Sequence, residues 1–453
     1  MTRCLAGGEA LFSALLLCCF SLQGQQGSAA FIDVTVVPMD NDRIVPHSTV
    51  ITKNGRIAAF GPVGEIIVPN GTARIDGRGK FLMPGLADMH VHLNVGGRTS
   101  GRLKNEQYAT LFLANGVTTV RNMWGNPDVL AFRRAVDQGS IIGPQIYTTG
   151  PLTDGNLPIR PRSRVVETIS QAIDAVKDDK AKGYDAVKVY NRLSPETYEA
   201  IVSTARAVGL PVYGHVPDQV GIEGVLRARQ DSIEHVGGYL EALDLDPSPG
   251  RATELVSATR KAGTWNCVTL VFYDGAVPPS EGLRLLAKPS MRFVPSALLG
   301  TWLHDRQLAS LTISQFDRLR LYDKKRKDFV RELHRGGAKI LLGTDTPNQY
   351  TVPGFAVHEE LRNLTETGFT PYEAIRAGTS DAARFLMAQR QWGIVGVGLR
   401  ADLILLEANP LQDVDNIRKQ VGVMVRGRWM PEAEIKASLE RLRMSYQHAE
   451  QAR

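Results

Sequence analysis

Apolar runs of strand length alternate with amphipathic segments of helix length through the middle of the chain. Residues 117–120 and 145–148 are short and rich in apolar or β-branched side chains, which predicts strands. Residues 126–139 and 163–183 follow them and have the length and spacing of helices. The alternation continues between about residues 83 and 385, a pattern typical of a parallel sheet whose strands are joined by helices.

The two ends of this region predict strands only. Residues 31–37, 48–51 and 57–60 read as strands, with a turn at Asn54-Gly55, and residues 401–406 and 421–429 read as strands again. We expect the two ends to pair in one small β-sandwich. Two independent β appendages are the alternative.

The first thirty residues predict an export signal. Arg3 precedes an apolar stretch at residues 10–22, and Ser28-Ala29-Ala30 resembles a cleavage site with small side chains. The apolar stretch is too short for a comfortable membrane span. We therefore expect a periplasmic or extracellular protein with no stable membrane span after signal cleavage.

Cysteine positions leave one alternative to soluble export. Cys18 and Cys19 raise the prospect of a lipoprotein, but Leu17 directly before Cys18 does not suit a lipobox, so lipid anchoring ranks second. After cleavage only Cys267 remains, and a single cysteine cannot form an internal disulfide.

The composition is that of a globular protein. Of 453 residues, 43% are hydrophobic and 22% are charged, which excludes disordered and fibrous classes and allows a barrel with a small second domain. The net charge is +6, but the densest basic run, residues 324–327, is interleaved with acidic residues as on a solvated helix face. We expect a small-molecule or dipeptide substrate and no nucleic-acid partner; a homo-oligomer is left open.

Two histidines follow a short apolar run that begins with Pro84-Gly85-Leu86. His90 and His92 are separated by one residue, so on a strand their side chains point to the same face and can bind one metal ion. Four further residues that could bind a metal each stand at the end of a later strand-like segment: Lys188, His215, His235 and Asp345.

Each of these residues also has an ordinary structural interpretation. A buried lysine is usually paired, a single histidine is often hydrogen-bonded in a core, and Asp345 could cap a following helix. The metal interpretation accounts for all six positions together. Ligands at the ends of several strands also favour a closed (β/α)8 barrel over an open sheet, because only the rim of a barrel brings so many strand ends together.

The order His-x-His, Lys, His, His, Asp resembles the amidohydrolase superfamily of binuclear metal hydrolases, and the resemblance covers about residues 31–429. Residues 116–121 and 381–384 are similar to the imidazolonepropionase-like and dipeptidase-like branch. The resemblance implies a (β/α)8 TIM barrel at residues 83–388. The predicted organisation is a signal peptide at 1–30, β-sandwich parts at 31–82 and 389–432, the barrel between them, and a C-terminal helical tail at 433–453.

The resemblance also implies the metal chemistry. A protonated lysine cannot bind a metal, but in superfamily members with a lysine here carbon dioxide adds to the neutral amine to form a bridging carbamate. One ion would then be held by His90, His92 and Asp345 and the other by His215 and His235, with carboxylated Lys188 between them. Two Zn²⁺ ions suit the imidazoles best; Mn²⁺, Co²⁺ or Fe²⁺ are the alternatives. The two ions share a water that becomes hydroxide, and Asp345 takes its proton as the catalytic base.

The expected reaction is hydrolysis of an amide or peptide C–N bond in a dipeptide, an N-acyl amino acid or a cyclic amide. Lys188 argues against imidazolonepropionase activity, and the absence of a Ser-Gly-Gly segment after Lys188 argues against specificity for Xaa-Pro. A phosphotriesterase or lactonase on the same metal pair is the alternative. A non-catalytic relative would lack ligands, and none is missing here.

Two further side chains and one long segment are candidates for substrate contact. We expect Tyr190 and Arg121 to lie near the rim of the barrel, where they could bind a substrate carboxylate or carbonyl. Residues 274–311 contain four prolines and read as a long loop, which we interpret as a lid or a wall of the substrate site.

Overall fold

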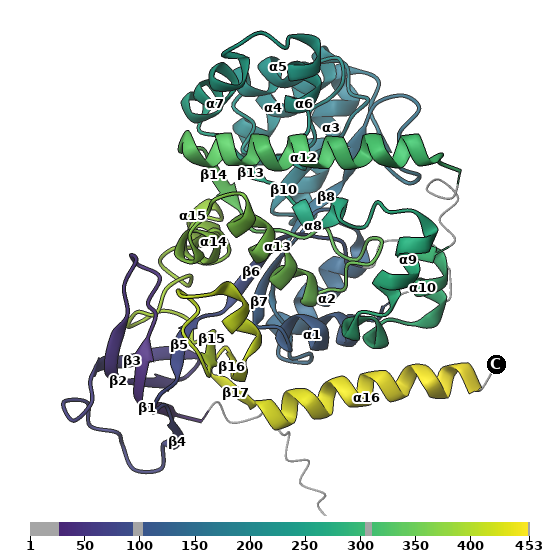
Figure 1. The fold of residues 1–453 in the computed structure, drawn as a ribbon. Helices are drawn as coiled ribbons and strands as arrows, with labels where there is room; N and C mark the ends of the chain where they lie inside the picture. The colour runs from purple at the N-terminus through teal and green to yellow at the C-terminus, as the bar shows by residue number, and fades with distance from the viewer. Residues whose placement is uncertain (1–26, 94–102, 304–309, 452–453) are drawn as a thin grey trace, which may run out of the picture.

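The computed structural model describes residues 27–93, 103–303 and 310–451, which form a parallel barrel and a β domain (Figure 1). Most of the predicted signal peptide, residues 1–26, lies outside the described residues. Within the described part of the chain, none of the helices has the length and apolar character needed to cross a membrane.

The barrel consists of eight parallel strands that follow one another around it in chain order. They are β6 (Leu86–Val91), β7 (Val117–Asn122), β8 (Gln145–Asp154), β10 (Ala186–Val189), β11 (Val212–Gly214), β12 (Ser232–Glu234), β13 (Trp265–Cys267) and β14 (Lys339–Leu341). The chain beyond β14 then runs beside β6, where the Met89 amide donates to Leu342 O at 2.8 Å and the Asp345 amide donates to His90 O at 2.7 Å. These bonds close the sheet, which confirms the predicted barrel.

A buried carboxylate reinforces this closure. Asp88 on β6 accepts hydrogen bonds from the Thr344 amide at 3.0 Å and from Thr344 Oγ1 at 2.6 Å. Burial raises the pKa of Asp88 to about 7, against the opposing effect of the Thr344 hydrogen bonds. The contact ties the strand that carries His90 to the segment that carries Asp345.

Helices surround the barrel strands (Figure 1). They are α1 (Asn105–Leu113), α2 (Pro127–Asp137), α3 (Ile169–Ala181), α4 (Pro195–Val208), α5 (Gly221–Arg227), α6 (Tyr239–Leu245), α7 (Arg251–Ala262), α12 (Ile313–Arg335), α13 (Phe355–Glu366), α14 (Pro371–Ala377) and α15 (Ser380–Phe385). The helix predicted from residue 163 begins later because Thr168 and Gln171 form a capping box, and residues 164–165 form the short strand β9 beside β8.

Both ends of the chain build the second domain. Its eight strands are β1 (Ala29–Val36), β2 (Val45–Lys53), β3 (Arg56–Pro62), β4 (Ala73–Asp76), β5 (Phe81–Pro84), β15 (Leu403–Leu406), β16 (Gln420–Val425) and β17 (Arg428–Pro431). β5 pairs with β15, so the two ends form one sheet, and the alternative of independent appendages is wrong. The apolar face buries Phe31 against Trp429, with ring centroids 5.3 Å apart.

The predicted cleavage site lies partly inside this sheet. Ala29 and Ala30 are buried in β1 and pair with Thr52 and Ile51 of β2. Cleavage after Ala30 would remove these two paired residues from the start of the strand.

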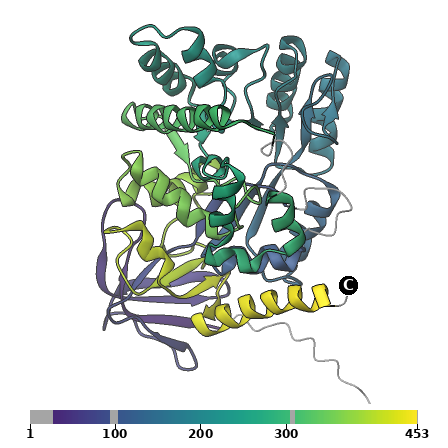
Figure 2. The same ribbon diagram turned by 45° about the vertical axis from the view of Figure 1, so that its right-hand side comes forward.

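Residues 274–303 differ from the predicted loop. They form α9 (Pro279–Leu286), the 3-10 helix η1 (Pro289–Phe293) and α10 (Ser296–Leu303). The segment packs beside α13, where the Phe293 and Phe355 rings stack at 5.5 Å and Lys288 pairs with Glu359 at 2.8 Å. The C-terminal helix α16 (Glu432–Gln451) runs along its other side (Figure 2).

Candidate metal centre

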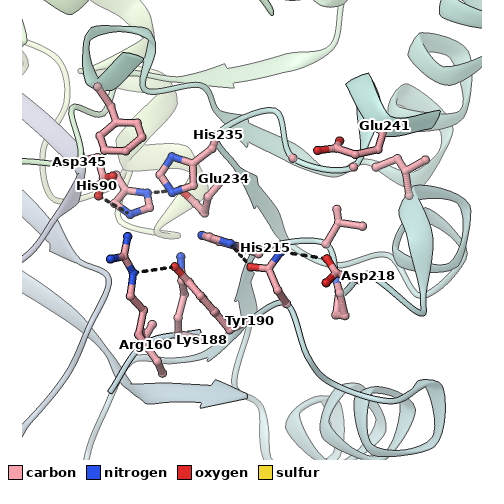
Figure 3. A pocket seen from close by; sticks show the side chains of 18 of the residues that line it. His90, Arg160, Lys188, Tyr190, His215, Asp218, Glu234, His235, Glu241 and Asp345 are labelled. Carbon is pink, nitrogen blue, oxygen red and sulfur yellow. Dashed lines mark hydrogen bonds and ion pairs between the residues drawn. The ribbon is translucent and has the colours of Figure 1, made fainter. Parts of the chain in front are cut away.

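The C-terminal ends of the barrel strands meet in a cavity of about 750 Å³. All six predicted ligands line it: His90, His92, Lys188, His215, His235 and Asp345. Figure 3 labels all of them except His92. They come from five different strands or from the segments just after them. The structure therefore brings together side chains that are up to 255 positions apart in the sequence, from His90 to Asp345.

Several of the predicted ligands lie close enough together to bind one ion. Asp345 Oδ1 is 2.6 Å from His92 Nε2 and 3.3 Å from His90 Nε2. The His235 ring centroid is 4.6 Å from that of His90 and 5.0 Å from that of His215. His90, His235 and Asp345 each offer a ligand atom within 4.8 Å of the other two.

The backbone at two of these positions is strained. His235 has φ 65° and Asp345 has φ 60°, a left-handed conformation that is uncommon for residues other than glycine and that is often found at functional sites. The turn at Asp345 is held by Asn348, whose Nδ2 donates to Asp345 O at 2.5 Å. No helix begins directly after Asp345, since α13 starts at Phe355, so the helix-cap interpretation is wrong.

Three histidines are oriented by a hydrogen bond to Nδ1. The partner is Glu234 Oε2 for His90, Asn191 Oδ1 for His215 and Thr269 Oγ1 for His235, each at 2.7 Å. Each bond leaves Nε2 free for the centre of the cavity. Partners of this kind fix the tautomer and the ring plane of a metal ligand.

The protonation of the site suits a divalent cation. Burial lowers the pKa of His90 to about 4 and the pKa values of His215 and His235 well below their usual range, so these imidazoles are neutral. Burial acts to raise the pKa of Asp345, but the nearby imidazoles of His90 and His92 outweigh it and hold this pKa well below its usual range. Neutral imidazoles with one carboxylate are a donor set that zinc and similar ions prefer.

Lys188 has an environment that does not suit an ammonium group. Its Nζ is buried and has no hydrogen-bond partner in the described part of the chain. Burial lowers the pKa of Lys188 to about 8, although Glu234 and Asp345 oppose this effect. A larger fraction of the amine is therefore neutral near pH 7 than in an exposed lysine.

Arg121 does not lie at the rim, and the prediction that it binds substrate is wrong. Its side chain is 1% exposed and lies in the barrel interior, outside the lining of the cavity. Its guanidinium contacts Glu234 Oε1 at 3.0 Å and Ser232 Oγ at 3.0 Å. It thus neutralises the carboxylate that orients His90.

Tyr190 does line the cavity. Its ring lies 4.0 Å from that of His215, and its hydroxyl accepts a hydrogen bond from Arg160 Nε at 3.4 Å. Burial raises the pKa of Tyr190, so the phenol stays neutral. Arg160 and Tyr190 form a polar edge beside the histidines, whereas Asp218 and Glu241 lie at the opposite side (Figure 3).

The sequence interpretation missed several residues of the site. Glu234 was detectable, because a carboxylate directly before His235 in a buried strand requires a partner. Arg160, Asn191 and Thr269 lie in loops after strands, and no spacing in the sequence marks them as site residues. The wall predicted from residues 274–311 is instead formed by Phe272 and Tyr273, and none of residues 274–303 lines the cavity.

Comparison with known proteins agrees with this geometry. The model of the amidohydrolase family matches residues 81–430. Ochratoxinase of Aspergillus niger is 25% identical over 388 residues, which covers 74% of this chain and 71% of the relative. A solved structure from Bifidobacterium longum, described as a candidate prolidase, is 27% identical with a TM-score of 0.69 and covers 92% of this chain and 99% of that one. The bottromycin amidohydrolase shares the fold at 23% identity, with a TM-score of 0.72 and coverage of 92% and 90%.

Replacing Glu234 by Gln tests the orientation of His90. The amide keeps the shape but leaves the charge of Arg121 without a carboxylate, so we expect zinc affinity to fall about 10–100-fold. Competition with a chromophoric chelator measures this on the purified protein. Glu223→Gln is the matched control, because Glu223 is exposed at the outer part of the same cavity. Unchanged affinity in Glu234→Gln would show that His90 needs no such partner.

Proposed function

The chain belongs to the amidohydrolase family, and from this premise we propose that it is an exported binuclear metal hydrolase that cleaves the amide bond of a small substrate with a free carboxylate. Family membership makes it a hydrolase and supports a carbon–nitrogen bond as the bond that it cleaves. The observation that carries the binuclear proposal is Lys188, whose buried Nζ lies among the histidines without a hydrogen-bond partner in the described residues.

We assign two ion sites to the six side chains. His90, His92 and Asp345 would hold one ion, His215 and His235 would hold the other, and a carbamate on Lys188 would be a ligand of both. When the neutral amine of Lys188 attacks the carbon of carbon dioxide, a C–N bond forms, one C=O π bond opens onto its oxygen, and the nitrogen gives a proton to water, so the resulting carbamate anion would offer oxygen ligands to both ions. When bound, two divalent ions, zinc by preference and manganese, cobalt or iron as alternatives, would lower the pKa of a water molecule and polarise the scissile carbonyl.

The residues of the chain carry the proton transfers. Asp345 is ionised, it lines the cavity, and its Oδ1 contacts the Nε2 atoms of His90 and His92. It accepts the proton of the attacking water and delivers it to the departing nitrogen. Glu234, Asn191 and Thr269 keep the three imidazoles in one tautomer while this proton moves.

The polar edge of the cavity supports the choice of substrate. Arg160 and Tyr190 present a guanidinium and a neutral hydroxyl that can both donate to a carboxylate. The acyl half of a substrate held there extends towards Trp124, Phe272 and Tyr273, which give the cavity an apolar wall. A dipeptide or an N-acyl amino acid has this distribution of charge and apolar surface.

Export is the second part of the proposal. Its support is the sequence of the first thirty residues, in which a basic position, a short apolar stretch and small residues follow one another. N-terminal sequencing of protein recovered from its native host should then begin near residue 31, and an intact Met1 would contradict export.

A substrate panel tests the proposed reaction. We expect turnover of dipeptides or N-acyl amino acids and a large loss of kcat/KM when the same compounds carry a C-terminal amide. Arg160→Ala should lower kcat/KM for the free carboxylates by about ten-fold, because it removes a charge-assisted hydrogen bond. Arg162→Ala, in the same loop but outside the lining of the cavity, is the control. Faster hydrolysis of lactones or phosphotriesters than of every amide would favour the alternative and contradict this proposal.

Replacing Asp345 by Asn separates metal binding from proton transfer. The amide keeps an oxygen towards the metal site, so the fold and much of the bound metal should remain. It cannot accept the proton, and kcat should fall by about 10²–10⁴. The exposed Asp128→Asn serves as control. Unchanged kcat in Asp345→Asn would leave this residue without a role in catalysis.

A further inference from the structure

A second carboxylate is buried close to the site but takes no part in the mechanism described above. Glu360 lies on α13 and is fully buried, and within the described residues no cationic side chain forms an ion pair with it. Its two oxygens instead accept hydrogen bonds from the amides of Leu270, at 2.9 Å, and Val271, at 2.6 Å. Burying a carboxyl group is costly unless hydrogen bonds replace its lost hydration, and these two bonds do so.

The segment that Glu360 holds reaches the metal centre directly. Leu270 and Val271 begin the four-residue helix α8 (Leu270–Tyr273), and the residue before them is Thr269. Thr269 Oγ1 contacts His235 Nδ1 at 2.7 Å, and Phe272 and Tyr273 form part of the cavity wall. Glu360 therefore holds the backbone that connects the hydroxyl of Thr269 with the two rings of the cavity wall.

Thr269 needs such support because its own backbone is strained. Its φ is 47° and its ψ is 46°, a left-handed conformation that is rare for a β-branched residue. Left alone, the turn would relax towards an ordinary conformation and carry the hydroxyl away from His235. The two hydrogen bonds to Glu360 act on the next two amides and oppose this relaxation.

We infer that Glu360 is a positioning residue of the metal centre, which holds the turn at residues 269–271 so that Thr269 orients the imidazole of His235. The inference rests on the proposed function in one respect, the assignment of His235 as a metal ligand. Glu360 touches no metal ligand itself, and its effect passes through Thr269.

The neighbouring residue Glu359 provides the matched control. It has the same side chain on the same helix but points elsewhere, since it pairs with Lys288 at 2.8 Å and is 24% exposed. A change of Glu359 alters the charge of α13 without touching residues 269–271.

The test measures zinc affinity of the purified full-length protein by competition with a chromophoric chelator. Glu360→Gln keeps the size of the side chain but retains only one acceptor oxygen, so one of the two amides loses its partner. We expect a loss of zinc affinity of about ten-fold, at the lower end of the effect of changing a group that orients a ligand. Glu359→Gln should bind zinc as the wild type does.

A double-mutant cycle with Thr269→Val distinguishes positioning from general packing. Valine has the shape of threonine without the hydroxyl, so Thr269→Val should itself lower zinc affinity. Because both residues act along one path, adding Glu360→Gln to Thr269→Val should cause almost no further loss. Full additivity, or a lower melting temperature with unchanged zinc affinity, would overturn the inference.

Two more variants separate the remaining outcomes. If Glu360→Gln does not fold, Glu360→Asp replaces it, because it keeps the carboxyl group but is one methylene shorter; it should weaken zinc binding, and wild-type affinity would contradict the inference. His235→Ala tests the assignment of His235 as a metal ligand, on which the inference rests. If His235→Ala binds both ions normally, the proposed function fails. If His235→Ala loses zinc while the Glu360 variants do not, only the positioning role of Glu360 fails.

Discussion

The contact between Arg121 and Glu234 beneath the cavity is the interaction on which the rest of the site depends. Both side chains are almost completely buried, and Glu234 Oε2 also contacts His90 Nδ1 at 2.7 Å. Removing one partner of a buried ion pair typically costs about 3–5 kcal/mol, because the other charge is left in a medium of low dielectric constant. Arg121 therefore compensates the buried charge of Glu234, and Glu234 in turn fixes the orientation of His90.

The closure of the barrel adds the second constraint. Asp88 and Thr344 join β6 to the segment after β14, which places Asp345 Oδ1 2.6 Å from His92 Nε2. His215 and His235 each have a partner from a different segment, Asn191 and Thr269 respectively. Three of the four imidazoles are thus oriented by other residues of the chain, which lowers the conformational cost of metal binding.

The sequence was sufficient to predict the barrel and the six candidate ligands. Each of these residues ends a short apolar run, and the ends of parallel strands meet at one rim of a barrel. The sequence failed where the direction of a side chain depends on the closed barrel. Arg121 was predicted to lie near the rim, but its side chain points inward to Glu234. Arg160, Asn191 and Thr269 are ordinary loop residues whose roles arise only from tertiary contacts, and the helices at residues 279–303 were hidden by prolines that suggested a loop.

The central claim is that six side chains, including a carboxylated lysine, hold two divalent ions. Elemental analysis of the purified protein and of Lys188→Ala, both prepared without chelators, measures it most directly. The account predicts close to two ions per wild-type chain and a loss of bound metal in Lys188→Ala, because the bridge between the ions is gone. A fully active wild type without metal, or a Lys188→Ala protein that still holds two ions, would contradict it.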